Sequence, residues 1–175
     1  AEARGNPLAL LEFPRALTPA ELAGGFGLPG ALARSLGGTF RHQVDALPVS
    51  TRLLLALAAA EPSGDPALLW AAAAILDIAG EAAEPAIESG LAEFGSRIRF
   101  RHPLVRSAAY QAVPLPQRRR LHGALAAVID ADADPDRRAW HQGRAALGRD
   151  DVVAAALERA AGRATRGLYR VHQFT

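Results

Sequence analysis

Apolar and polar positions along the chain repeat mainly with the spacing of helices. Apolar stripes predict helices over residues 51–60, 66–76 and 81–89. Ser50 is the expected N-cap of the first, Asp65-Pro66 opens the second, and Gly90 ends the third. Leu91–Phe94 and Ile98–His102 instead alternate apolar with polar residues around a Gly-Ser pair, which is the pattern of a β-hairpin. Three helices followed by a hairpin is the order of a winged helix.

The pattern on the C-terminal side predicts further helices joined by short turns. They cover residues 103–110, 115–131, 137–147 and 150–164, and aspartates at 134, 136 and 150 are placed to cap them. Such a series is typical of a tetratricopeptide-like repeat array. The predicted fold class is therefore mostly α, a winged-helix-like three-helix unit with one β-hairpin followed by tetratricopeptide-like helices.

The N-terminal part is predicted to contain a helix that starts near Asn6, a glycine-rich loop over 24–38 and a short helix from Phe40 to Ala46. The last residues, 167–175, lose the alanine-rich character and form an atypical tail. The expected division is residues 1–45, 46–113 for the winged-helix-like domain, 114–166 for the start of the repeats, and 167–175 for the tail.

The composition excludes several kinds of functional site but does not indicate a particular one. All 20 basic residues are arginine and the formal net charge is +2, so the high isoelectric point of about 9.9 is weak evidence for nucleic-acid binding. The chain has no cysteine, which excludes disulfides, thiolate zinc sites and cysteine nucleophiles. No leader sequence and no apolar run of about 18 residues is evident, so we expect a cytoplasmic location without a membrane partner.

Four landmarks occur in a familiar order. They are Gly5–Leu10, Leu47-Pro48 with Thr51–Leu55, Phe100–Tyr110 and Asp134–His141. Together they resemble the large ATP-binding LuxR-type transcriptional regulators, the signalling ATPases related to the maltose activator. The resemblance covers most of residues 1–165 and fails in the tail.

The resemblance implies that the chain is an internal part of a regulator with an ATPase, a winged helix, a helical-repeat region and a DNA-binding helix-turn-helix. Gly5 and Pro7 would belong to the ATPase lid that closes on adenine. His102 would contact the diphosphate of ADP, although Pro103 stands where the family pattern has aspartate. The implied role is a regulatory interaction module that relays nucleotide state to the rest of the regulator, or to a second copy by self-association.

ATP or ADP is implied only for the longer parent. A phosphate-binding loop of the Gly-x-x-x-x-Gly-Lys-Ser/Thr type needs a lysine, and this sequence has none. We therefore expect no bound cofactor and no ATP hydrolysis in this segment. No metal site is expected either, because aspartates 134 and 136 near His141 are better explained as helix caps.

Two other functions stay open. Ser35, in the sequence Ala33–Gly37, could be the nucleophile of a small esterase-like hydrolase, but no strand is predicted before it. The hairpin could bind DNA directly through Arg97, Arg99 and Arg101, although the preceding helix is acidic. Histidines 42, 102, 122 and 141 could each act as a base, and tryptophans 70 and 140 are expected in the core.

Overall fold

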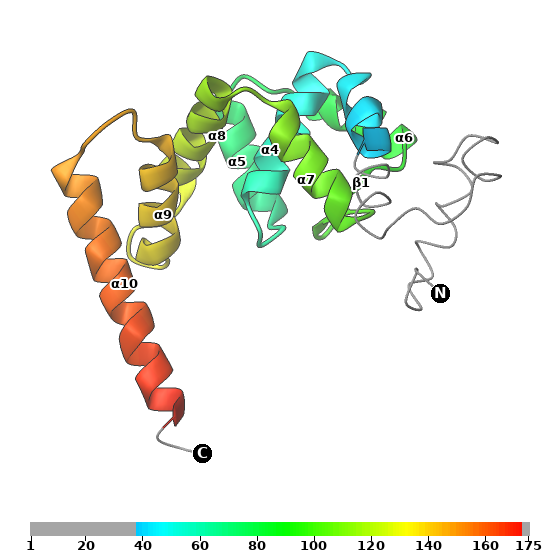
Figure 1. Ribbon diagram of the computed structural model, residues 1–175. Coiled ribbons are helices and arrows are strands. Elements are labelled where there is room, and N and C mark those ends of the chain that lie inside the picture. Colours follow the sequence, from blue (N-terminus) through cyan, green and yellow to red (C-terminus); the bar gives the residue numbers. More distant parts are fainter. Residues whose placement is uncertain (1–37, 173–175) are drawn as a thin grey trace, which may run out of the picture.

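A computed structural model describes residues 38–172, and for residues 164–172 the backbone alone. The protein is mostly helical, with one two-stranded sheet among the described residues (Figure 1). Residues 38–45 are helical. The elements that follow are α4 (Val49–Ala60), α5 (Pro66–Ile75), the 3-10 helix η1 (Gly80–Ala83), α6 (Glu84–Glu88), β1 (Ala92–Phe94), β2 (Ile98–Phe100), α7 (Pro103–Ala112), α8 (Leu115–Val128), α9 (Pro135–Ala145) and α10 (Asp151–His172).

Helix α4 lies at the centre of the core because it is apolar on nearly every face. Leu54, Leu55 and Leu57 are fully buried, and α4 packs against α5, α7 and α8. The guanidinium of Arg106 on α7 donates from Nε and Nη2 to the carbonyl oxygen of Ala59, at 3.0 and 2.9 Å. These bonds satisfy a carbonyl of the last turn of α4 and fix α7 on it.

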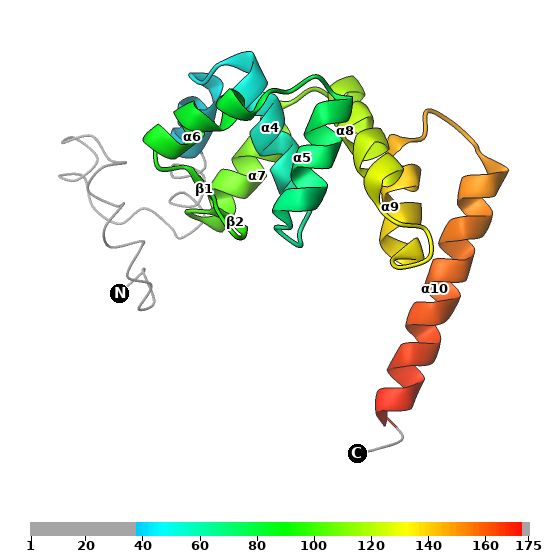
Figure 2. The same ribbon diagram turned by 180° about the vertical axis from the view of Figure 1, so that it is seen from behind.

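The predicted hairpin is confirmed. β1 pairs with β2 in antiparallel register, with Ala92 opposite Phe100 and Phe94 opposite Ile98. The inward-facing side of the hairpin closes the apolar core formed by α4, α5 and α7 (Figure 2). The α4–α7 unit, residues 49–112, therefore consists of helices and a hairpin packed together through apolar side chains, and α8 adds Leu121 and Leu125 to the same packing.

Two of the predicted helix boundaries are confirmed and two are not. Asp65 and Asp134 cap α5 and α9 by accepting from backbone N–H groups, as predicted. Ser50 does not cap α4, because the helix already begins at Val49 after Pro48. The helix predicted over 81–89 is two short helices, η1 and α6, since Pro85 has no N–H to continue a single ladder.

Helices α8, α9 and α10 extend the molecule away from the hairpin (Figure 2). α8 packs against α4 and α5 on one side and against α9 on the other, and α10 packs against α9. The prediction that this last helix would end at residue 164 was wrong, because α10 continues to His172.

Within residues 38–172, no single helix is both long and apolar enough to cross a bilayer, although the bent pair Pro66–Ile75 and Gly80–Glu88 reaches both measures when counted together.

Candidate functional site: a buried polar chain between alpha 4 and alpha 9

Three residues singled out from the sequence, Gly5, Pro7 and Ser35, lie outside the described residues. His102, the proposed diphosphate sensor, lies directly after the hairpin and is the N-cap of α7. Its Nδ1 accepts from the backbone N–H of Leu104 at 3.0 Å, and its ring stacks on Phe40 with centroids 5.7 Å apart. An accepting Nδ1 places the hydrogen of the neutral imidazole on Nε2, which is therefore a donor.

The three hairpin arginines are exposed but do not form one free basic surface. Arg97 donates from Nη2 to the carbonyl oxygen of Ser63 at 3.2 Å. Arg99 lies opposite Glu93 in the register of the hairpin. Exposed acidic residues also precede the hairpin, Glu81 on η1 and Glu84 on α6. The arrangement gives DNA binding by this hairpin no specific support.

The most unusual feature is a set of polar side chains buried between α4 and α9. Glu61, His122 and His141 are 3%, 1% and 0% exposed. Charged or ionisable side chains are seldom buried so completely unless they are paired, because desolvation penalises the charged form. We refer to Arg144, Tyr110, His122, His141 and Glu61, in the order in which they contact one another, as the buried polar chain. Its last three members are buried, whereas Tyr110 is half-buried and Arg144 is exposed.

Glu61 directly follows the last residue of α4. Its Oε1 accepts from the Ser63 backbone N–H at 2.8 Å and from Arg137 Nη1 at 3.1 Å. Its Oε2 lies 3.4 Å from Nε2 of His141, and neither of these atoms has a hydrogen-bond partner within the described part of the chain. Arg137 and His141 both come from α9, so one carboxylate joins the end of α4 to two turns of α9.

The two histidines contact each other directly. Nδ1 of His122 on α8 lies 2.8 Å from Nδ1 of His141 on α9, a hydrogen-bond distance that requires one hydrogen between the nitrogens. Nε2 of His122 lies 2.8 Å from the hydroxyl of Tyr110 on α7, and that hydroxyl accepts from Arg144 Nη2 at 3.0 Å. Three helices and the residue that follows α4 therefore contribute to one continuous set of contacts.

One assignment of hydrogens satisfies each hydrogen bond of the chain with both histidines neutral. Arg144 donates to the oxygen of Tyr110, and the Tyr110 hydroxyl donates to Nε2 of His122. Nδ1 of His122 then donates to Nδ1 of His141, whose Nε2–H faces Glu61 at 3.4 Å without forming a hydrogen bond. Because a carboxylate can only accept, Glu61 favours this direction, and the oxygen of Tyr110 accepts from Arg144 in either direction.

The electrostatics agree with a neutral His122. Burial, together with repulsion from Arg144 and from a proton shared with His141, lowers the pKa of His122 from 6.5 to about 4. For Glu61, burial acts to raise the pKa, but the polar contacts with His141 and Ser63 and the charge of Arg137 outweigh it, so the pKa falls to about 2. His122 is therefore neutral and Glu61 ionised at neutral pH.

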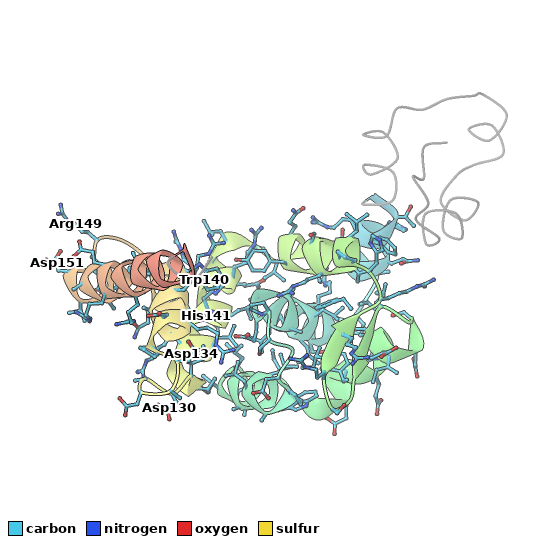
Figure 3. All side chains as sticks on the ribbon, turned by 90° about the horizontal axis from the view of Figure 1, so that it is seen from below. Asp130, Asp134, Trp140, His141, Arg149 and Asp151 are labelled. Carbon is cyan, nitrogen blue, oxygen red and sulfur yellow. The ribbon has the colours of Figure 1, made fainter. Side chains whose placement is uncertain are left out.

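Aromatic rings cover the histidine pair. Trp140 meets both imidazoles edge to face, with centroids 5.3 Å from His122 and 4.8 Å from His141. Trp140 as a whole is 46% exposed, so the expectation that it lies in the core was wrong. Figure 3 shows Trp140 and His141 on α9, with Asp134 at the start of that helix. The indole therefore shields the pair from water while it forms part of the surface.

Sequence reasoning noted each histidine but missed their pairing. His122 lies on the apolar stripe of its helix with Leu121 and Leu125, so its burial was foreseeable. Its partner depends on how α8 and α9 are set against each other, which a single sequence does not give. Among the described residues, no group of three or more histidine, aspartate or glutamate side chains is arranged to hold a metal ion.

Comparison with known proteins finds no relative: no family model matches the chain, and searches of curated proteins and of solved structures find no match.

Proposed function

We propose that this chain is the regulatory core of a LuxR-type ATP-binding transcriptional regulator, in which a winged-helix-like unit relays nucleotide state to a helical-repeat region. The α4–α7 unit would be the winged helix, and α8–α10 the first tetratricopeptide-like repeats. The order of helices and hairpin within α4–α7 supports this assignment. Its partner would be the rest of the regulator, acting in the cytoplasm.

The observation that carries the proposal is the position of α8. This helix packs on α4 and α5 and, through its other side, on α9, which in turn packs on α10. Tyr110, Glu61 and the histidine pair add polar contacts between the same elements. A displacement of the α4–α7 unit would therefore be carried to α9 and α10 by contacts between closely packed side chains.

His102 is the residue through which nucleotide would act. Its Nδ1 is held by Leu104, so Nε2–H is the atom that would donate to a diphosphate oxygen of ADP. Because the same ring caps α7 and stacks on Phe40, contact with the nucleotide would bear directly on the start of α7. ADP would be held by an ATPase upstream of the described residues.

The reading frame upstream gives the first test. We expect it to encode a phosphate-binding loop with the lysine that this chain lacks. In that longer protein, His102→Asn should retain the α7 cap, since asparagine is a favoured N-cap residue, but should remove the imidazole Nε2–H, because the shorter asparagine amide does not extend to the same position. The loss of one charge-assisted hydrogen bond predicts a rise of about tenfold or more in the Kd for ADP, measured by calorimetry.

The matched control is His42→Gln, a histidine exposed on the helical residues 38–45, which should leave ADP affinity unchanged. An upstream sequence without a phosphate-binding loop would contradict the proposal. So would an ADP affinity that His102→Asn and His42→Gln leave equally unaltered.

A further inference from the structure

The way in which α9 is attached to the rest of the molecule is unusual. It packs mainly on α8 and α10. It also contacts the α4–α7 unit and the residue that follows α4: Arg137 and His141 contact Glu61, and Arg144 contacts Tyr110. These contacts are polar, and polar bonds, unlike apolar packing, can be broken by adding a proton.

The geometry of the histidine pair limits how many protons it can hold. The neutral pair carries one hydrogen between the two Nδ1 atoms, 2.8 Å apart. A proton added to Nε2 of His122 would turn that atom into a donor toward Tyr110, whose own O–H would then lose its acceptor. A second added proton would set two N–H groups against each other between the Nδ1 atoms, which a 2.8 Å separation does not allow.

The surrounding charges also oppose protonation of His122. Arg144 of α9 donates to the same Tyr110 hydroxyl, and the guanidinium of Arg118 on α8 lies 5.1 Å from the centre of the Tyr110 ring. Helix α5, which also packs on α8, has no ionisable side chain. The compensating negative charge, Glu61 at the end of α4, lies beyond His141 and is shared with Arg137.

We propose that the buried polar chain is an acid-released latch, which holds α9 and α10 against the α4–α7 unit while His122 is neutral and frees them when His122 is protonated. The proposal concerns a proton rather than a nucleotide, so it stands or falls separately from the function proposed above. The lowered pKa of His122, about 4, agrees with a latch that is closed at neutral pH. We therefore expect release as the pH falls from 6.5, the ordinary histidine pKa, toward about 4.

The sequence makes the test straightforward, because the whole chain has no native cysteine. Ala74→Cys on α5 and Ala154→Cys on α10, both at exposed positions, allow two nitroxide labels whose separation is measured by pulsed electron paramagnetic resonance. At pH 7.5 we expect one narrow distance distribution. Between pH 6.5 and 4.5 a longer distance should appear, with the ratio of open to closed rising by up to about tenfold per pH unit.

Circular dichroism on the same samples distinguishes release from unfolding, because a released latch keeps its helical signal. His122→Gln removes the proton acceptor, so the distance distribution should no longer depend on pH. His42→Gln, an exposed histidine outside the buried polar chain, should behave like the parent. Tyr110→Phe removes a bond of the closed form and should move the midpoint of release to higher pH.

Three results would overturn the latch: a distance distribution in the parent that does not change between pH 7.5 and 4.5, a longer distance that appears only as helical signal is lost, or a response that persists in His122→Gln. If His122→Gln does not fold, the same decision rests on Tyr110→Phe, whose midpoint must differ from that of the parent while that of His42→Gln does not.

Discussion

At the scale of single residues, the structure contrasts a half-buried hydroxyl group that has two partners with a fully buried one that has none among the described residues. The hydroxyl of Tyr110 contacts both His122 and Arg144, at 2.8 and 3.0 Å. Oγ1 of Thr51, in the first turn of α4, is fully buried and has no hydrogen-bond partner within the described part of the chain. Removing a buried hydroxyl costs stability chiefly when it leaves other groups unpaired, so the two residues should respond in opposite ways.

Tyr110→Phe should therefore destabilise the fold, because Nε2 of His122 and one N–H of Arg144 both lose their partner. We expect the free energy of unfolding at pH 7.5 to fall by about 1–3 kcal/mol, measured by urea denaturation. Thr51→Val removes a buried hydroxyl that has no partner among the described residues, so it serves as the control. Its free energy of unfolding should be unchanged or slightly higher. Equal losses in the two variants would show that the contacts of Tyr110 contribute nothing specific.

At the scale of elements, local chemistry made much of the fold predictable. The hairpin and the caps Asp65 and Asp134 each depend on residues within a few positions, so one sequence reveals them. The prediction that Ser50 caps α4 was wrong because the helix begins one residue earlier, at Val49, directly after Pro48. The prediction of one helix over 81–89 was wrong because Pro85 interrupts the hydrogen bonding, although the helical pattern of apolar residues looks continuous.

The candidate site was not predictable in the same way. His122 and His141 are 19 residues apart on different helices, and Arg137 reaches Glu61 across 76 residues. Their contacts depend on the rotation and offset of α8 and α9 against α4, which is decided by packing over the whole interface. The sequence shows the individual residues and their helices, and only the assembled helices show that they meet.

The loop between α4 and α5 offers a prediction at the element scale. Gly64 has a φ of +67°, and its carbonyl oxygen accepts from the N–H of Ile98 at 2.9 Å, which ties this loop to β2. A Cβ at this position would lie 2.8 Å from the carbonyl oxygen of Ile98. Gly64 therefore combines a conformation that favours glycine with a backbone contact that leaves no room for a side chain.

Gly64→Ala should destabilise the protein by about 2–4 kcal/mol, since it adds a backbone clash to the usual cost of a left-handed conformation. Gly90→Ala has a similar φ of +62° but open space around the added Cβ, so it should cost only about 1 kcal/mol. Thermal or urea unfolding compares the two variants directly. A loss at Gly90 as large as that at Gly64 would show that the contact with Ile98 is not decisive.

At the scale of the whole molecule, the buried polar chain predicts how stability depends on pH. The pKa of His122 is lower in the folded protein than its ordinary value of 6.5, so the unfolded chain binds more protons between pH 6.5 and 4. The free energy of unfolding must therefore fall as the pH falls through this interval. Glu61, with a pKa of about 2 against 4.5, adds a further loss only between pH 4.5 and 2.

Between pH 7.5 and 5 the contribution of His122 alone should lower the free energy of unfolding by about 2 kcal/mol, since each unit of unequal proton binding is worth about 1.4 kcal/mol. Urea denaturation at several pH values measures this slope. His122→Gln removes the titrating ring, so its profile should be flatter by the same amount, while His42→Gln should retain the slope of the parent. A slope that survives in His122→Gln would mean that the acid sensitivity of the fold arises outside the histidine pair.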